Sequence, residues 1–369
     1  MSAPQCNVMA RIRADVQAMH AYVVQDAHGM VKLDAMENPH RLSPALQAEL
    51  GQRLGAVALN RYPDGRINDL HRALATYAPV PQGFALTLGN GSDELISMLA
   101  LACAIPPDQS NGFKKAVVLA PVPGFVMYRM SAQLQGLDFV GVPLTADFEL
   151  DESAMLAAIA EHQPAITYLA YPNNPTANLW NDGVIEKVIQ AAGVQGGLVV
   201  MDEAYQPFAA HSYLNRLARH GHVLLLRTLS KFGLAGVRLG YLIGPSALVA
   251  EVDKVRPPYN VSVLNCEAAL FALEHQYVFE AQAIDICAQR ALIFDALAKL
   301  PQVTAFPSQA NMLLVRVPDA QKTFGGMAAR GVLVKNVSRM HPMLTQCLRL
   351  TVGTAAENRL MLTALEASL

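Results

Sequence analysis

The chain has 369 residues, of which 52% are hydrophobic and 16% are charged, and its formal net charge at pH 7 is −2. This length allows two domains of ordinary size, and the composition predicts a globular protein with a large core. A nearly neutral chain without basic runs offers no electrostatic attraction to nucleic acid or to an anionic membrane, so neither is an expected partner.

Cysteines, histidines and apolar runs limit the chemistry and the location further. The five cysteines and ten histidines show no metal-binding spacing, so no metal site is expected. Scattered cysteines in odd number are typical of reduced thiols in a cytoplasm. No stretch approaches the ~18 apolar residues of a membrane helix, and the first residues lack the apolar segment of a signal peptide. We expect a soluble, cytoplasmic protein.

In chain order, residues 1–45 are interrupted by Pro and Asn and predict an N-terminal arm. Residues 46–262 alternate apolar runs with helical stretches, which predicts a large α/β domain with a mostly parallel sheet wrapped by helices. Residues 263–369 begin with one or two long helices and continue as a smaller α+β domain. The expected strands are Phe84–Leu88, Ala116–Ala120, Ala165–Ala170, Leu198–Met201, Val223–Arg227, Gly240–Ile243, Met312–Val317, Val332–Val337 and Leu348–Val352, and the expected helices include Glu94–Cys103, Glu152–Ala160 and Ile185–Ala191.

Ligands of open α/β sheets bind beyond the carboxyl ends of the strands, so the residues that follow each predicted strand are the first candidates for a site. The first strand is followed by Gly91, Ser92 and Asp93 at the start of a helix. Free backbone N–H groups and the helix dipole make such a turn an anion site, best suited to phosphate. An ordinary capped turn is the alternative for this motif taken alone.

Three other strand ends add polar side chains. Three groups each follow a predicted strand: Asn174 between two prolines, the pair Asp202 and Tyr205, and Lys231 directly after a segment with two hydroxyl residues. A carboxylate at the end of a buried strand is costly unless a cation or a strong donor meets it. A turn, a helix cap and a solvated lysine would explain these residues separately, but they do not explain why all of them occur at strand ends.

Pyridoxal 5'-phosphate (PLP) is a cofactor that uses all of these groups, because it has a phosphate, a pyridine nitrogen, a phenolic oxygen and an aldehyde. Asp202 would keep the ring nitrogen protonated, and Tyr205 and Asn174 would donate to the phenolic oxygen. Lys231 would hold the aldehyde as a Schiff base. Phe125 would cover the ring face, unless it is a core aromatic. The expected phosphate ligands are Gly91, Ser92, Asp93, Thr228, Ser230 and Arg238.

These motifs resemble those of fold-type I PLP-dependent aminotransferases and, among them, of the histidinol-phosphate aminotransferase family. The lysine and Asp–Tyr motifs are typical of the superfamily, whereas the segments at 33–39 and 89–94 are more typical of the family. The resemblance covers nearly the whole chain, and its segments are Leu33–Pro39, Arg61–Gly65, Gly89–Glu94, Tyr171–Thr176, Asp202–Tyr205, Thr228–Lys231 and Cys347–Gly353.

The resemblance implies a homodimeric enzyme of histidine biosynthesis. It would exchange amino and keto groups between L-histidinol phosphate and 2-oxoglutarate, giving imidazole acetol phosphate and glutamate. Its catalytic residues would be Lys231, Asp202 and Tyr205, with Lys231 moving the substrate proton. Tyr62 would reach the cofactor phosphate of the other subunit. The implied substrate ligands are Tyr22, Asn38, Lys335, Arg339 and Arg349.

The chain departs from the family pattern at a few positions. Met36 replaces the Asn that commonly opens the family's NENP segment, so this side chain cannot donate to substrate. The arginine expected after residues 332–334 is Lys335 here, with Arg339 nearby as a substitute. The interval from Lys231 to Arg238 is one residue shorter than the commonest spacing. These departures concern the substrate more than the cofactor.

Two other activities share most of these motifs: an aromatic or broad-specificity aminotransferase, and a PLP lyase such as threonine-phosphate decarboxylase. A non-catalytic PLP-binding regulator is a third alternative, from a different class. Such regulators have an added DNA-binding domain, and the residues before the first predicted strand contain no basic helix-turn-helix pattern. The complete set of proton-handling residues favours an enzyme.

Overall fold

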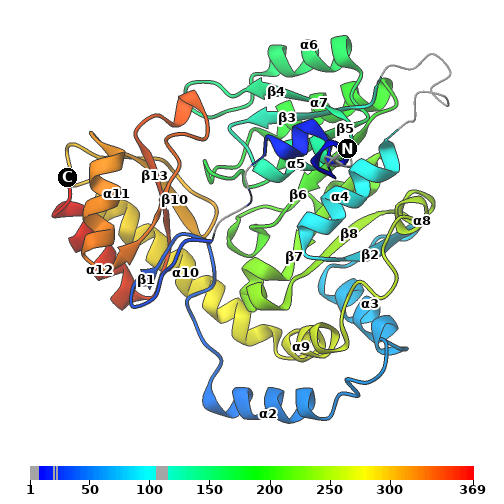
Figure 1. Ribbon diagram of the computed structural model, residues 1–369, viewed down its shortest axis with the longest axis horizontal. Helices are drawn as coiled ribbons and strands as arrows, with labels where there is room; N and C mark the ends of the chain where they lie inside the picture. Colours follow the sequence, from blue (N-terminus) through cyan, green and yellow to red (C-terminus); the bar gives the residue numbers. More distant parts are fainter. Residues whose placement is uncertain (1–7, 20, 22–23, 105–114) are drawn as a thin grey trace, which may run out of the picture.

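A computed structural model describes residues 8–19, 21, 24–104 and 115–369, which form a central sheet of seven strands and a smaller sheet beside it (Figure 1). The strand order of the central sheet is β2-β8-β7-β6-β5-β3-β4. β8 is antiparallel to both of its neighbours, and the pairs from β7 to β4 are parallel. The strands are β2 (Phe84–Asn90), β3 (Val117–Val122), β4 (Asp138–Pro143), β5 (Ile166–Ala170), β6 (Leu198–Asp202), β7 (Val223–Thr228) and β8 (Leu239–Pro245).

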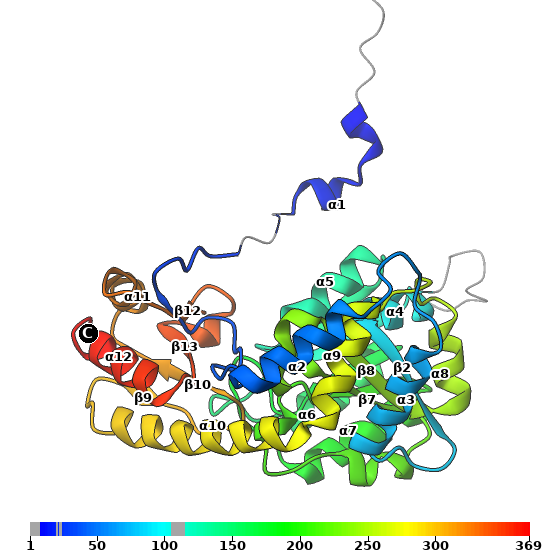
Figure 2. The same ribbon diagram turned by 90° about the horizontal axis from the view of Figure 1, so that it is seen from below.

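Helices cover both faces of the central sheet (Figures 1 and 2). On one face, Val200 and Leu224 pack in a core with α4, α5 and α8, whereas Val199 and Leu225 pack on the other face with α3, α6, α7 and α9. Burial on both faces is why these strands are continuously apolar instead of alternating. The helices are α3 (Arg66–Tyr77), α4 (Ser92–Cys103), α5 (Val126–Leu134), α6 (Glu152–His162), α7 (Asp182–Val194), α8 (Ser246–Asp253) and α9 (Val263–Glu274).

The smaller sheet has the order β12-β13-β10-β9 and packs against three helices. The long helix α10 runs from the central sheet to this second sheet (Figure 2). Near the N-terminus, β1 (Val31–Lys32) pairs with β11 (Val332–Leu333), and Leu33 and Met36 join the core of the smaller sheet. The remaining elements here are β9 (Thr304–Ala305), β10 (Met312–Arg316), β12 (Lys335–Asn336), β13 (Cys347–Thr351), α10 (Gln276–Leu297), α11 (Ala320–Ala329) and α12 (Ala355–Glu366).

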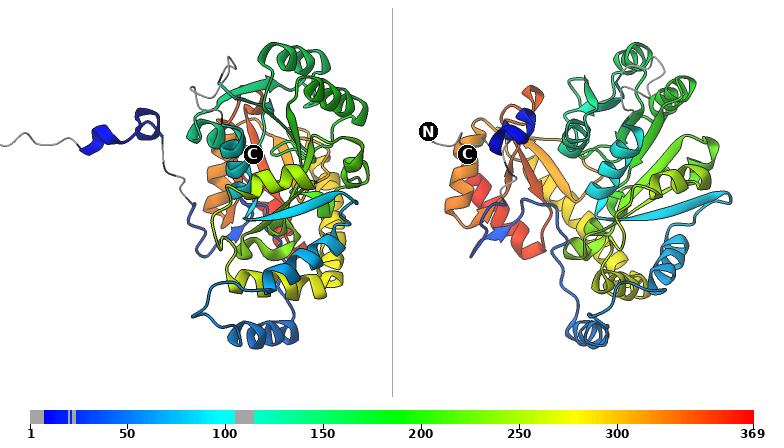
Figure 3. Two further views of the ribbon diagram at one scale, coloured as in Figure 1. Left: turned by 90° about the vertical axis from the view of Figure 1, so that its right-hand side faces the viewer. Right: turned by 45° about the vertical axis from the view of Figure 1, so that its right-hand side comes forward.

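Two helices, one before β1 and one after it, lie outside the sheets. α1 (Ala14–Gln17) protrudes from the body of the molecule (Figure 3), although its N-cap Arg13 donates to the carbonyls of Gln133 and Leu134 at the end of α5. α2 (Pro44–Gly55) lies along one side of the molecule (Figure 1). Neither of them, nor any other helix in the part of the chain that the structure describes, is long and apolar enough to cross a membrane.

The strands differ from the sequence prediction at four places, of which two are the two-residue strands β1 and β9, which were not predicted. β4 was not predicted, because it is an edge strand whose residues are mostly half-buried and include the exposed Asp138. The single strand predicted at 332–337 is divided after Leu333, because β11 pairs with β1 whereas β12 pairs with β13. The other predicted strands are confirmed to within a few residues at each end.

Candidate active site

The predicted cofactor residues gather in one pocket at the carboxyl edge of the central sheet. β6 and β7 are parallel neighbours, so Asp202 and Thr228 reach the same edge, where the N-terminus of α4 also lies. The turn that follows β5 brings Asn174 to the same place. The pocket is lined by Met36, Ser92, Asp93, Phe125, Tyr128, Ala170, Pro172, Asn174, Asp202, Ala204, Tyr205, Thr228, Ser230, Lys231 and Arg238.

Hydroxyl groups, a guanidinium and a helix N-terminus form one end of the pocket. The hydroxyl of Thr228 donates to Oγ of Ser230 at 3.0 Å, and Nη1 of Arg238 donates to the same oxygen at 3.2 Å. Nη2 of Arg238 lies 3.4 Å from Oδ2 of Asp93 in the first turn of α4. The short interval from Lys231 therefore still brings Arg238 to the hydroxyls. This group suits a phosphate.

Gly91 is needed at this end for two reasons. Its φ is +78°, in the left-handed region, and a Cβ there would lie 2.5 Å from Nη2 of Arg238. Glycine adopts this conformation without the steric cost that other residues pay. The residue thus allows the guanidinium to approach the start of α4.

Asp202 is the last residue of β6 and is buried with 4% exposure. Its Oδ2 accepts from the hydroxyl of Tyr128 at 2.6 Å, and its Oδ1 accepts from the backbone N–H of Ala204 at 3.0 Å. Burial raises the pKa of Asp202, and the hydrogen bond from Tyr128 lowers it. Burial is the larger effect, so the pKa rises to about 6. A desolvated carboxylate of this kind would be stabilised by a cation such as a protonated pyridine. The adjacent Glu203 pairs with Arg227 instead.

Tyr128 was not singled out from the sequence. It lies three residues after Phe125, and the two rings are 5.6 Å apart in an edge-to-face arrangement. Its other face stacks on Tyr168 at 4.2 Å, which fixes the direction of its hydroxyl. The short spacing was a usable signal, because Phe125 as the N-cap of α5 and Tyr128 in its first turn stand together at the start of the helix.

Lys231 lies in the short π-helix Ser230–Leu234 that follows β7. Its Nζ donates to the carbonyl of Ala35 at 3.0 Å and lies 5.8 Å from the centroid of the Tyr205 ring. Burial, and then the positive charge of Arg349, lower the pKa of Lys231 to about 8. A lysine with this pKa is partly neutral near pH 7.5 and can attack an aldehyde.

Asn174 connects this pocket to the smaller sheet. Its Nδ2 donates to the hydroxyl oxygen of Tyr205 at 3.0 Å, and its Oδ1 accepts from Nη1 of Arg349 at 2.8 Å. Arg349 on β13 is buried with 7% exposure and lies opposite Lys335 of β12 in the sheet register. Directly opposed residues of antiparallel strands face the same side, so Lys335 stands on the same face of the smaller sheet as Arg349.

Three of the remaining predicted residues are not among those that line this pocket. Tyr62 is 75% exposed and stacks on Tyr259, outside the pocket of its own chain. Arg339 is exposed, and the amide of Asn38 is hydrogen-bonded to Gln282 and to the carbonyl of Phe232. Tyr22 lies outside the described residues. The roles predicted for these four side chains stay predictions.

A larger cavity, of about 670 Å³, lies elsewhere, between α10 and the chain after β6. It includes Arg227, whose charge is already paired with Glu203, and several apolar side chains. No lysine lines this cavity, so it does not combine a lysine with a carboxylate and hydroxyl groups as the smaller pocket does. The chemistry therefore points to the pocket at Lys231 as the active site.

Comparison with known proteins agrees with this geometry. Residues 28–365 match the family of class I and II aminotransferases, and the chain belongs to that family. It is 71% identical to the histidinol-phosphate aminotransferase of Polaromonas naphthalenivorans, over 97% of this chain and 96% of that protein, and 68% identical to the one of Methylibium petroleiphilum, over 96% and 94%. Within the class, the chain belongs to the histidinol-phosphate aminotransferases.

A solved structure shows the same fold. The histidinol-phosphate aminotransferase of Sinorhizobium meliloti, in complex with pyridoxal-5'-phosphate, aligns with a TM-score of 0.82 at 24% identity and covers 97% of each chain. An L-threonine-O-3-phosphate decarboxylase from Porphyromonas gingivalis aligns with a TM-score of 0.75 at 21% identity, over 91% of this chain and 98% of that one. The fold is thus fold-type I, and it alone does not separate transaminase from lyase.

Proposed function

We propose that this protein is a PLP-dependent transaminase that exchanges the amino group of L-histidinol phosphate with the keto group of 2-oxoglutarate. The products are imidazole acetol phosphate and glutamate, in histidine biosynthesis. The observation that supports this most is the pocket that unites Lys231, Asp202, Tyr205 and Asn174 in a chain 71% identical to a histidinol-phosphate aminotransferase over nearly its full length.

The residues of the pocket fit PLP group by group. Asp202, with its raised pKa, would hold the ring nitrogen, while Tyr205 and Asn174 would bind the phenolic oxygen. Phe125 would cover the ring, and Lys231 would bind the aldehyde carbon. When bound, PLP supplies a sink for the electrons that the substrate Cα releases. The phosphate would be held by Gly91, Ser92, Asp93, Thr228, Ser230 and Arg238.

Lys231 is proposed to carry the substrate proton. Its pKa of about 8 leaves a fraction of the amine neutral at physiological pH, so Nζ can take a proton from the substrate Cα once the amine is free. Tyr205 limits the position of that amine from one side, since Nζ lies over its ring. The enclosed position of Lys231 would keep water away from the substrate Cα while its proton is removed.

Arg349 and Lys335 are proposed to bind the anionic end of both substrates. They lie opposite each other on β13 and β12, so one dianionic phosphate or one carboxylate can meet both cations. Lysine offers a point charge where a guanidinium would offer two parallel donors, so the phosphate site should be geometrically less selective. Tyr22, Asn38 and Arg339 remain candidate substrate ligands.

We also propose a homodimer in the cytoplasm, in which Tyr62 contacts the cofactor phosphate of the partner subunit. Tyr62 is 75% exposed and stacks on Tyr259, which is 57% exposed, and Leu59 three positions earlier is 68% exposed. A second copy of the chain would cover them. Within each subunit we divide the chain into an arm (1–45), a large PLP-binding domain (46–262) and a small domain (263–369).

Steady-state kinetics with separate substrates test this assignment. We expect histidinol phosphate to give a kcat/KM at least about a hundredfold above that of phenylalanine, because a dianionic phosphate gains more from the two cations than a carboxylate does. Equal values would indicate an aromatic or broad-specificity aminotransferase. Release of carbon dioxide from threonine phosphate, without consumption of 2-oxoglutarate, would indicate the lyase.

A further inference from the structure

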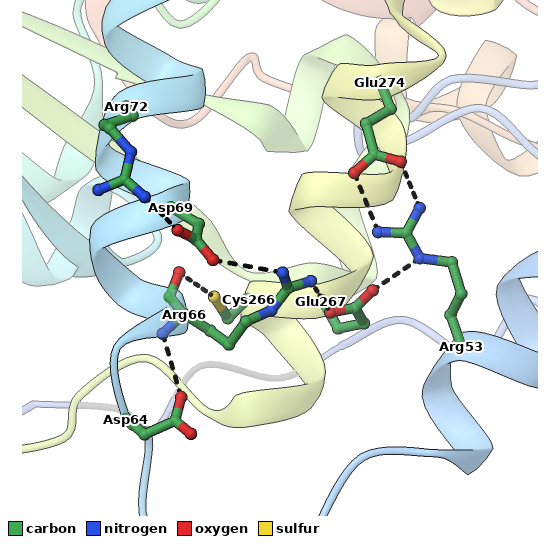
Figure 4. Close-up of polar contacts among 8 residues, drawn as sticks. All are labelled: Arg53, Asp64, Arg66, Asp69, Arg72, Cys266, Glu267 and Glu274. Carbon is green, nitrogen blue, oxygen red and sulfur yellow. Dashed lines mark hydrogen bonds and ion pairs between the residues drawn. The ribbon is translucent and has the colours of Figure 1, made fainter.

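A chain of alternating charges joins three helices (Figure 4). Its central members and Tyr62 line the same cavity. This charge chain links α9 to α2, returns to α9 and continues to α3, and each link is a hydrogen-bonded ion pair. No member belongs to the pocket at Lys231. In order, the residues are Glu274, Arg53, Glu267, Arg66, Asp69 and Arg72.

Glu267 is the centre of this charge chain and its most buried member, with a side chain that is 11% exposed. Its Oε1 accepts from Nε of Arg53 at 2.6 Å, and its Oε2 accepts from Nη2 of Arg66 at 2.5 Å. Burial raises the pKa of Glu267, but the hydrogen bonds from Arg66 and Arg53 outweigh it, so the pKa lies below its usual value. The carboxylate is therefore charged at neutral pH and bridges the two arginines.

The two arginines lie at the ends of the connection that includes Tyr62. Arg53 is in the last turn of α2, and Arg66 is the first residue of α3. Of the described residues 44–65, none is buried, so apolar packing within the subunit does not determine the path of this connection. A cavity of about 360 Å³ lies between the connection and α9, and its walls include Glu267 and Tyr62.

The middle of the connection makes one further contact with the same region. The ring of Tyr62 stacks on Tyr259, with centroids 4.5 Å apart and an interplanar angle of 17°. Tyr259 lies just before α9, the helix that contains Glu267. One stretch of the chain thus holds the connection at both ends through charge and at its middle through stacking.

We propose that Glu267 is a positioning residue, which holds Tyr62 where it meets the cofactor phosphate of the partner subunit. This rests on the dimer and on the role of Tyr62 proposed above. Loss of the Glu267 charge leaves Arg53 paired with Glu274 and Arg66 paired with Asp69, so neither cation is left without an anion. What is lost is the bridge between the end of α2 and the start of α3.

A double-mutant cycle on the release of PLP tests this. The rate at which purified holoenzyme releases PLP after dilution is followed by the cofactor absorbance, without substrate. Glu267→Gln should accelerate release about fivefold to tenfold, as expected for one weakened charge-assisted hydrogen bond. In a Tyr62→Phe protein the same change should add less than about twofold, because the hydroxyl that it positions is gone.

Glu274→Gln is the matched control. It removes another carboxylate from Arg53, but the side chain of Glu274 is 55% exposed and the bridge at Glu267 stays intact. We expect it to change release by less than about twofold. If Glu267→Gln does not fold, Arg66→Gln breaks the same bridge at a side chain that is 50% exposed, and must give the same pattern.

The proposal would be overturned if Glu267→Gln accelerated PLP release equally in the wild-type and Tyr62→Phe proteins, or accelerated it in neither. Acceleration by Glu267→Gln with no effect of Tyr62→Phe would also overturn it, and would remove the proposed role of Tyr62 as well. Because substrate is absent from these measurements, a wrong amino donor would not change any of them.

Discussion

The hydroxyl of Tyr128 lies 2.6 Å from Oδ2 of Asp202 and joins the first turn of α5 to the end of β6. This hydrogen bond opposes the effect of burial, which raises the pKa of Asp202 to about 6. The ionised carboxylate is the form that can hold the proton of a pyridine nitrogen. Tyr128 would therefore act on bound PLP through Asp202.

Tyr128→Phe should raise the pKa of Asp202 further, because a donor to the charged form is lost. PLP binding to the cofactor-free wild-type protein should weaken as pH falls through about 6, where Asp202 becomes protonated. In the variant this weakening should begin at higher pH, and kcat/KM at pH 7 should fall about tenfold. Titrations with PLP across pH measure both. Superimposable pH profiles would contradict the role of Tyr128.

Lys231→Ala should still bind PLP through the phosphate and ring contacts, but borohydride should no longer fix the cofactor to the chain. Turnover should fall by at least about a hundredfold, the smaller end of what a positioned base contributes. In the wild-type protein, PLP loading should accelerate with rising pH and level off above about 8, because the neutral amine then predominates. Stopped-flow absorbance measures the loading rate, and a pH-independent rate would contradict the lowered pKa.

Arg349→Gln should damage both half-reactions, since each substrate presents an anion to the same cations. The loss of a buried charge-assisted contact predicts a fall in kcat/KM of about a hundredfold for each. Lys335→Gln should affect histidinol phosphate more than glutamate, because a dianion gains more from a second cation. Single-turnover kinetics of each half-reaction separate these effects. An equal, small effect of both variants would place the anion site elsewhere.

Gly91→Ala should weaken PLP binding about tenfold, because a left-handed backbone is costly with a side chain and Arg238 must move from the phosphate site. Gly221→Ala is a suitable control, because a Cβ there meets nothing within 4 Å and the backbone is not left-handed. Cofactor titration together with thermal unfolding distinguishes a local from a general effect. Equal changes in the two variants would show that Gly91 has no special part in the site.

Much of this site could be predicted from the sequence, because each motif follows a strand and parallel strands end at one edge of a sheet. Lys231, Asp202 and Asn174 were found in this way, and the pocket contains all three. The contact between Tyr128 and Asp202 could not be found from strand ends, because it joins residues 74 positions apart through the packing of α5 on the sheet.

The fold was less predictable where burial is partial. β4 was missed because an edge strand does not have the continuous apolar run of its buried neighbours. The division between β11 and β12 depends on pairing with β1, some 300 positions earlier in the chain, and no local pattern reports that partner. Asn38 illustrates the same limit, because its hydrogen bonds to Gln282 and Phe232 arise only from tertiary packing.

Adjacent peptide carbonyls of the N-terminal segment hold two side chains of the site at once. The carbonyl of Asp34 accepts from Nη2 of Arg349, and the carbonyl of Ala35 accepts from Nζ of Lys231. Protein oxygens therefore hold both groups before any ligand arrives. An incoming anion takes the place of a carbonyl at Arg349, whereas Nζ of Lys231 gives up its hydrogen bond to Ala35 when it bonds to an aldehyde carbon. The folded chain thus orients the two side chains in advance of binding.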